Sequence, residues 1–160
     1  MFNLFNKKQT LLAPADGRLI PLSQVADPVF SQKILGDGVA IDELNSDTIC
    51  SPADGVLEMI FRTNHAFAVK TSEGIDVLVH IGINTVELEG KGFERLREQG
   101  QSVKAGDPVI RIDRQQILQA GYSLTTPVIF TSTDTIKELA IEEKSTVITG
   151  KDAILTYKKR

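Results

Sequence analysis

Short runs of apolar and β-branched residues alternate with turn sequences along most of the chain. The turns are "ADG" at 15–17, "GDG" at 36–38, "ADG" at 53–55, "SEG" at 72–74 and "AGD" at 105–107. Short strands separated by such turns are typical of all-β sandwiches and barrels. The pattern therefore predicts an all-β fold, a compact antiparallel β-sandwich or barrel.

Helical periodicity is confined to two short segments. One helical turn is predicted near Phe93–Gln99, and another after Thr133 or Asp134, which would act as the N-cap. The fold prediction therefore includes one or two short helical turns.

The chain begins with a segment unlike the rest. Residues 1–10 are predicted to be a flexible N-terminal segment, followed by a single domain over residues 11–160. Met1, Phe2, Leu4 and Phe5 with two lysines also suggest a weak peripheral contact of residues 1–8 with an anionic membrane surface.

One short sequence occurs twice. "APADG" at 13–17 and "SPADG" at 51–55 each precede a strand-like run. Two copies are consistent with a pseudo-symmetric sheet built from related halves, although Asp-Gly is a common turn pair.

Both histidines of the chain, His65 and His80, flank the turn "TSEG". A hairpin with a four-residue loop places them directly opposite each other, with Cβ atoms about 4.5–5.5 Å apart. A three-residue loop shifts the pairing by one residue, so the register depends on a turn type that the sequence leaves open.

Strand alternation assigns the histidines to one face of the sheet. Val77, Val79 and Ile81 would face the core, whereas His80 and Leu78 would face the other way. On the partner strand, Phe61, Thr63, His65 and Phe67 are predicted to share the histidine face.

Two close imidazoles suit phosphoryl transfer. They cannot both be cationic without repulsion, and a neutral imidazole is a nucleophile near pH 7. The second ring can donate an N–H to the phosphoryl oxygens, and a threonine hydroxyl can orient it. The alternatives are a pair of semi-buried structural histidines and a zinc site, for which a third ligand such as Asp76 or Glu87 would be needed.

Composition narrows the class of protein. The 160 residues carry a formal net charge of −3, and no basic stripe interleaves with aromatic residues, so nucleic acid is not an expected partner. There is no apolar run of membrane-spanning length and no signal peptide, and the single cysteine, Cys50, fits a reducing compartment. We therefore expect a cytoplasmic protein, with Cys50 as a small buried apolar residue.

The histidine region resembles a known family. "GIDVLVHIGINTVELEGKGF" with the upstream "TNHAF" resembles the glucose-type enzyme IIA domain of the bacterial phosphoenolpyruvate-dependent sugar phosphotransferase system. "DPVFSQKILGDGVAI", "SPADGVLEMIF", "VKAGDPVIRID" and "TTPVIF" are similar to further family segments in the family order. The resemblance covers nearly everything after the first ten residues.

The resemblance implies a phosphotransferase component with no cofactor. Family members accept a phosphoryl group from the phosphocarrier HPr on one histidine and pass it to a cysteine of an enzyme IIB domain. The matching acceptor is His80, modified on Nε2, with His65 as the supporting histidine and Thr63 as the threonine that orients it. Zinc is not required, although adventitious zinc could bind at His65 and His80.

The resemblance also implies one apolar docking surface for both partners. Its matching apolar positions are Val29, Phe30, Ile34, Leu35, Phe61, Phe67, Leu78 and Val86. Asp27 matches an acidic rim position. Asn84 stands where the best-known members have aspartate, and we expect this change to alter partner preference rather than the chemistry.

Two other functions compete with the relay. One is a regulatory docking protein of the same fold, which binds transporters or kinases according to its phosphorylation state. The other is a zinc-dependent hydrolase.

Overall fold

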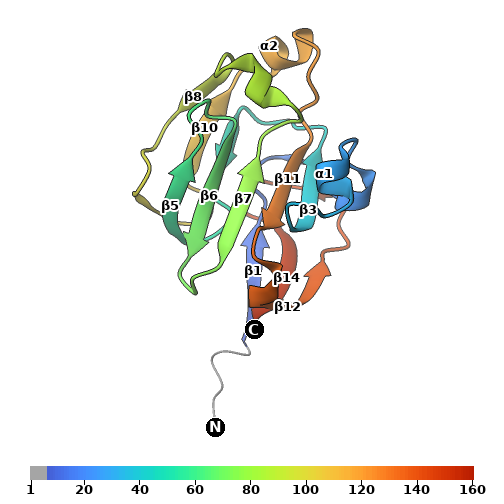
Figure 1. Cartoon of the computed structure of the whole chain (residues 1–160), viewed down its shortest axis with the longest axis vertical. Coiled ribbons are helices and arrows are strands. Elements are labelled where there is room, and N and C mark those ends of the chain that lie inside the picture. The colour runs from blue at the N-terminus through green and yellow to red at the C-terminus, as the bar shows by residue number, and fades with distance from the viewer. Residues whose placement is uncertain (1–6) are drawn as a thin grey trace.

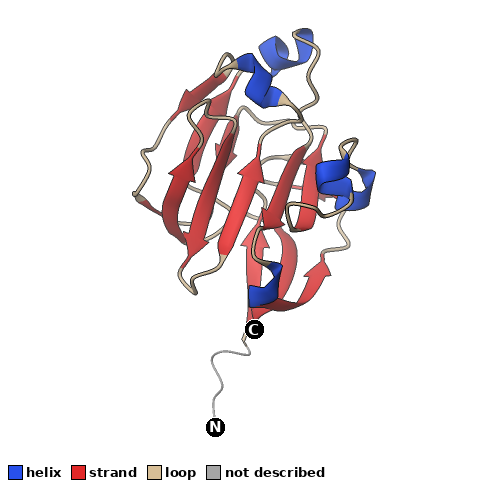
Figure 2. Cartoon of the chain, viewed as in Figure 1, coloured by secondary structure: helices blue, strands red, loops and turns tan. Residues whose placement is uncertain are grey.

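The computed structural model describes residues 7–160 of the chain. Within this range, fourteen strands form an eight-stranded sheet and two three-stranded sheets, and every pairing between strands is antiparallel. The helices in this range lie at the margins of the sheets (Figure 2). The predicted all-β antiparallel sandwich is confirmed.

The eight-stranded sheet has the order β13-β2-β3-β11-β7-β6-β5-β9. Its strands are β2 (Gly17–Pro21), β3 (Asp37–Asp42), β5 (Gly55–Ile60), β6 (Ala66–Thr71), β7 (Asp76–His80), β9 (Ser102–Val103), β11 (Thr126–Phe130) and β13 (Thr146–Val147). Figure 1 shows β5, β6, β7, β11 and β3 side by side across the front of the molecule.

The two smaller sheets have the orders β1-β14-β12 and β4-β10-β8. Their strands are β1 (Lys8–Leu12), β4 (Thr48–Cys50), β8 (Phe93–Arg95), β10 (Pro108–Ile112), β12 (Ile136–Ile141) and β14 (Ala153–Lys159). The α-helices are α1 (Pro28–Ser31) and α2 (Arg114–Gln119), and the 3₁₀ turns are η2 (Leu22–Gln24), η3 (Thr85–Leu88) and η4 (Thr133–Thr135).

The two "PADG" sequences lie at equivalent places in two related halves. Leu12 N–H donates to the Pro52 carbonyl at 2.9 Å, and Cys50 N–H donates to the Pro14 carbonyl at 2.8 Å, so the two copies bond reciprocally. The sheet order reads β13-β2-β3-β11 from one edge and β9-β5-β6-β7 from the other. The predicted pseudo-symmetry is therefore present.

The halves differ in how the chain runs through them. β4 to β10 form one half from a continuous segment, whereas the other half consists of β1 to β3 and β11 to β14. One half is thus inserted into the other. The axis relating them passes between the paired Val79 of β7 and Val128 of β11.

Each face of the eight-stranded sheet has its own apolar cluster. The main core lies between this sheet and the two smaller ones, and includes Leu11, Val39, Phe67, Val79, Ile110, Val128 and Leu155. A second cluster lies on the opposite face, where the segment between β2 and β3 covers the sheet, and comprises Ile20, Leu22, Val25, Phe30, Ala40, Ala66, Leu78, Ile83 and Ile129. This second face carries the histidines.

The helical turn predicted near Phe93–Gln99 was wrong, and the helix predicted after Thr133 or Asp134 is limited to the 3₁₀ turn η4. Phe93–Arg95 is strand β8, in which Phe93 pairs with Ile112, and residues after η4 form strand β12 against β14. Edge pairing in a smaller sheet outweighs a weak helical pattern. The real helices begin after Asp27 and Asp113, whose carboxylates accept the N–H groups of Val29 and Gln116.

The N-terminal boundary also differs from the prediction. Residues 8–10, predicted to be flexible, belong to β1, which pairs with β14 from Lys8 opposite Lys158. Most of the predicted membrane-contacting segment, residues 1–6, lies outside the described residues. Across residues 7–160, no helix is both long and apolar enough to cross a membrane.

Candidate functional site

The histidine pair lies at the ends of β6 and β7. The two ring centroids are 5.0 Å apart, and the ring planes are nearly perpendicular at 81°. His65 is 3% exposed, and His80 is partly exposed. The rings are thus in edge-to-face contact, with His80 the more accessible of the two.

The β6–β7 register is one residue away from the one that would oppose the histidines. Lys70 pairs with Asp76, and His80 therefore opposes Ala66. His65 precedes β6 and belongs to the turn between β5 and β6, so strand alternation does not fix its direction. The turn brings its ring to the face that carries His80.

The same shift in register removes Phe67 from the predicted docking surface. Phe67 opposes Val79, and its side chain is fully buried in the main core. A one-residue slip moves a strand side chain to the other face of the sheet. The prediction of Phe67 on the histidine face was wrong, and Ala66 and Ala68 lie there instead.

The turn between β5 and β6 orients His65. The Thr63 hydroxyl lies 2.5 Å from His65 Nδ1, and the Phe61 ring meets the imidazole edge-on at 5.3 Å between centroids. Asn64 has a left-handed backbone, with φ of 60°, that lets the chain reverse here. If the hydroxyl donates to Nδ1, the hydrogen of neutral His65 is on Nε2.

His80 is oriented by the backbone that follows it. Its Nδ1 lies 2.8 Å from the Gly82 carbonyl oxygen, which can only accept a hydrogen bond. Nδ1 therefore carries the hydrogen, and Nε2 keeps its lone pair when the ring is neutral.

Gly82 is required at this point of the backbone. Its φ is +80°, and a Cβ there would lie 2.5 Å from Cγ2 of the buried Thr85 and 2.7 Å from the Ser123 carbonyl oxygen. The Thr85 hydroxyl donates to the Ile81 carbonyl at 2.5 Å. Since Ile83 N–H donates to the Ser123 carbonyl at 3.1 Å, the peptide groups on both sides of Gly82 are held by hydrogen bonds.

Both histidines are held neutral at pH 7. Burial, followed by the neighbouring His80, lowers the pKa of His65 from 6.5 to about 4. Burial also lowers the pKa of His80, while the Gly82 carbonyl and the Asp27 carboxylate act in the opposite direction. A neutral His80 with a free Nε2 is a nucleophile, and His65 is the adjacent hydrogen-bond donor.

His80 lies against an apolar floor formed by Phe30, Leu78 and Phe61. The ring of Phe30, which α1 contributes, lies 5.1 Å from the His80 ring centroid at an angle of 55°. Phe30 and Leu78 are buried, and Phe61 packs against the same cluster. Asp27, the N-cap of α1, places its negative charge beside this floor.

Four predicted docking positions expose apolar side chains. Val29 is 37% exposed, Ile34 66%, Leu35 44% and Val86 51%. The first three follow one another around α1, and Val86 lies in η3 after His80. Asn84 is exposed and left-handed, with φ of 61°. Apolar side chains exposed together in this way are characteristic of interaction surfaces.

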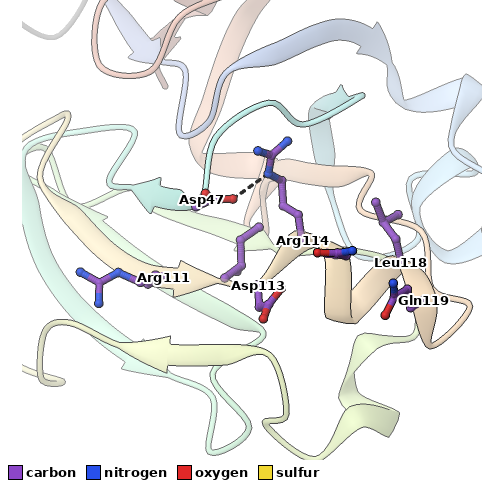
Figure 3. Close-up of a pocket in the computed structure, with 8 residues that line it drawn as sticks. Asp47, Arg111, Asp113, Arg114, Leu118 and Gln119 are labelled. Atoms are coloured by element: carbon purple, nitrogen blue, oxygen red, sulfur yellow. Dashed lines mark hydrogen bonds and ion pairs between the residues drawn. The ribbon is translucent and has the colours of Figure 1, made fainter.

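A separate hollow of the surface holds a different set of residues (Figure 3). It is lined by Asp47, Arg111, Ile112, Asp113, Arg114, Gln115, Leu118 and Gln119. Arg114 pairs with Asp47 at 2.7 Å, and Arg111 pairs with Glu94 at 2.9 Å. Its charges are thus largely neutralised within the protein, and neither histidine belongs to it.

The candidate metal ligands do not gather. Within the described part of the chain, no three His, Cys, Asp or Glu side chains form a group that could hold a metal ion. The predicted alternatives for a third ligand do not join the histidines: Asp76 pairs with Lys70, and Glu87 bonds to the Tyr122 hydroxyl. Cys50 is buried, with its pKa raised to about 11 by burial and nearby carboxylates, and is not a reactive thiol.

Most of the chain matches the model of a known protein family. Residues 9–136 match the family model of the phosphoenolpyruvate-dependent sugar phosphotransferase system, EIIA 1. The chain belongs to this family. As an EIIA protein it is a phosphotransferase component of that system.

Relatives of similar length match nearly the whole chain. A glucose-specific EIIA component from Haemophilus influenzae is 40% identical over 93% of this chain and 89% of its own length. One from Oceanobacillus iheyensis is 39% identical over 96% of each chain. The solved structure of glucose permease IIA from Mycoplasma capricolum, 37% identical, superposes with a TM-score of 0.86 and covers 97% of this chain and 99% of that one. The resemblance to the glucose-type EIIA family is confirmed.

Sequence reasoning missed two hydrogen bonds that hold the histidines. One joins His80 Nδ1 to the backbone carbonyl of Gly82, and the other joins two side chains near His65, where Arg95 Nε donates to Asn64 Oδ1 at 2.9 Å. Gly82 and Asn64 themselves were the available signals, because both residue types favour left-handed backbone.

Proposed function

We propose that this EIIA protein is a glucose-type phosphocarrier in which His80 is phosphorylated on Nε2 by phospho-HPr and donates the group to a cysteine of an enzyme IIB. The observation that carries the proposal is the bond between His80 Nδ1 and the Gly82 carbonyl, which leaves Nε2 as the free nucleophilic atom. The glucose-specific names of the relatives support the same substrate pathway.

The first transfer uses the lone pair of His80. Nε2 attacks phosphorus as the phosphorus–nitrogen bond of the donor phosphohistidine breaks, and the bonding pair returns to the donor imidazole. His65, with its hydrogen on Nε2, donates to a phosphoryl oxygen, while Thr63 holds its Nδ1.

The second transfer reverses the role of His80. The thiolate of the IIB cysteine attacks phosphorus, and the bond to Nε2 breaks. Neutral His80 is then regenerated, and its Nδ1–H still donates a hydrogen bond to the Gly82 carbonyl oxygen. A glucose-specific EIICBA component from Streptococcus pneumoniae, whose name joins EIIA to B and C units, is 46% identical over 81% of this chain and supports an IIB partner.

Both partners are proposed to dock on the apolar surface around His80. Val29, Ile34, Leu35 and Val86 supply its exposed apolar part, with Phe30, Leu78 and Phe61 beneath and Asp27 and Asn84 at the rim. The same surface suits regulatory docking to transporters or kinases, which remains a second prediction. Because docking and chemistry use neighbouring residues, phosphorylation would change the charge of the surface itself.

A phosphorylation assay tests the assignment. We expect phosphoenolpyruvate, enzyme I and HPr to place one acid-labile, base-stable phosphate on the wild type and none on His80→Gln. His65→Gln should still accept phosphate but transfer it to IIB about a hundredfold more slowly, because the imidazole N–H that Thr63 orients toward the phosphoryl group is lost.

Three outcomes would contradict this function. Phosphate on His80→Gln would remove His80 as the acceptor, and equal loss of acceptance in both variants would remove the division of roles. An unphosphorylated wild type with stoichiometric bound zinc would favour the hydrolase.

A further inference from the structure

The guanidinium group of Arg95 braces the turn that carries His65. Its Nε donates to Asn64 Oδ1 at 2.9 Å, and its Nη2 donates to the Phe61 carbonyl oxygen at 3.3 Å. The side chain is mostly buried, with 28% of its surface exposed, and its ion pair with the exposed Glu98 is long at 3.7 Å. The guanidinium group therefore lies closer to its hydrogen-bond acceptors in the turn than to the carboxylate of Glu98.

The braced turn decides where the His65 ring lies. Thr63, which holds His65 Nδ1, lies between the two residues that Arg95 contacts, Phe61 and Asn64. Asn64 N–H also donates to the Phe61 carbonyl at 2.7 Å, which closes the turn. Arg95 thus adds side-chain bonds to a turn that the backbone already closes.

Arg95 connects the His65 turn to the segment that carries His80. From His80 the chain passes through η3 and reaches Gly90, where a Cβ would lie 3.8 Å from the Thr63 carbonyl oxygen. It then enters β8, which supplies Arg95 from a different sheet. The placement of the His65 turn relative to His80 thus rests on the β6–β7 pairing, on the bond from Ile81 N–H to the His65 carbonyl at 2.7 Å, and on this contact between sheets.

We propose that Arg95 and Asn64 are positioning residues that hold His65 against the phosphoryl group on His80. The inference rests on the proposed function, because it assigns them to the His65-dependent step. It separates two duties of the site: His80 is held by the Gly82 carbonyl, whereas His65 is held by the Arg95–Asn64 contact through the turn.

Two pairs of variants test the contact. Arg95→Met removes the guanidinium, and Asn64→Gly removes its acceptor while keeping a residue suited to the left-handed backbone. Asn64→Asp keeps the acceptor oxygen and should behave as wild type. Arg111→Met is the matched control, because Arg111 lies on the adjacent strand and pairs with Glu94.

The two phosphoryl transfers are measured separately. We expect Arg95→Met and Asn64→Gly to accept phosphate from phospho-HPr within about twofold of wild type but to transfer it to IIB about tenfold more slowly, as a misplaced group would cause. In a His65→Gln background, Arg95→Met should slow transfer by less than about twofold further, because the group that it positions is already absent.

Each other result overturns the proposal. Equal loss of both transfers, independent additive effects of Arg95→Met and His65→Gln, or wild-type rates would each show that Arg95 does not act through His65. If Arg95→Met fails to fold, the comparison of Asn64→Gly with Asn64→Asp decides.

Failure of the proposed function can be recognised separately. If wild type accepts no phosphate, ¹⁵N chemical shifts of the His65 ring still report its bond to Thr63. A shift of Nδ1 in Arg95→Met but not in Arg111→Met would retain the positioning role, and unchanged shifts would remove it.

Discussion

The two imidazoles are held through the same ring atom by different partners. Thr63 occupies Nδ1 of His65, and the Gly82 carbonyl occupies Nδ1 of His80. In each ring Nε2 is therefore the atom left for chemistry, with a lone pair in neutral His80 and, when the Thr63 hydroxyl donates to Nδ1, a hydrogen in neutral His65. One residue type thus supplies both the donor and the nucleophile, and the difference comes from the group that each Nδ1 meets.

The buried His65 predicts a pH-dependent stability. Its folded pKa of about 4 lies below the ordinary 6.5, so the unfolded chain binds the proton more readily. Stability is therefore fully present above about pH 6.5 and is lost as the pH falls towards 4, by at most about 3 kcal/mol for this residue.

Urea unfolding at pH 7, 6, 5 and 4 measures this loss. We expect His65→Gln to show a shallower decline than wild type over that window, since it lacks the group that must be protonated. Parallel declines of the two proteins would show that His65 does not titrate abnormally.

The element most sensitive to a small change is the turn after β7. Gly82 and Gly74 have nearly the same positive φ, +80° and +83°, but a Cβ added at Gly82 would meet other atoms within 4 Å, whereas one added at Gly74 would meet none. The pair therefore separates backbone strain from steric clash.

We expect Gly74→Ala to lower the free energy of unfolding by about 1 kcal/mol and Gly82→Ala by about 3 kcal/mol. Gly82→Ala should also slow phosphorylation, because its carbonyl positions His80. Urea unfolding and the HPr assay measure the two effects. Equal destabilisation by the two variants would mean that the neighbours of Gly82 yield to the new methyl group.

In the β6–β7 hairpin, the sequence predicts which face each residue of β7 occupies but not the register between the two strands. The alternation of Val77, Leu78, Val79 and His80 correctly placed each residue on its face, since Val77 and Val79 are in the main core and Leu78 is in the second cluster. The sequence left two registers open, and the structure has the one with the three-residue loop, in which Thr71 N–H bonds to the Ile75 carbonyl. Phe67 was placed on the wrong face because that assignment assumed the four-residue loop.

At the scale of the whole molecule, the repeated "PADG" was the sequence signal for the architecture. It identified equivalent turns but not the insertion of one half into the other, which depends on pairings such as Lys8 with Lys158, far apart in the chain. Likewise the floor of the site could not be worked out from periodicity. Its Phe30 comes from α1 in one half, whereas its Leu78 and both histidines come from the other.

Asp16 and Asp54, the aspartates of the two "PADG" sequences, are expected to contribute unequally to the free energy of unfolding. Asp16 Oδ1 accepts from Thr149 N–H at 2.8 Å and from its hydroxyl at 2.7 Å, whereas Asp54 Oδ1 accepts from Ala105 N–H at 2.8 Å. Asp16 is also the less exposed of the two.

We expect Asp16→Ala to lower the free energy of unfolding by about 2 kcal/mol and Asp54→Ala by about 1 kcal/mol, since more bonds from less exposed groups are lost in the first. Urea unfolding of the two variants under the same conditions makes the comparison. A larger loss in Asp54→Ala would show that the inserted half depends more on its turn than the outer half does.

Because one half is inserted into the other, the strands of the two halves become available for pairing at different times during synthesis. Residues 48–112 contain every strand of the histidine half, so its pairings join segments close in sequence. The outer half needs β14, and its closure must wait for residues 153–159. Chain made from the N-terminus therefore has the means to bring His65 and His80 together first. The sheet beneath Phe30 is completed later, when β11 joins β3 to β7. We expect the histidine pair to form early in folding and the contact of Phe30 with His80 to form late.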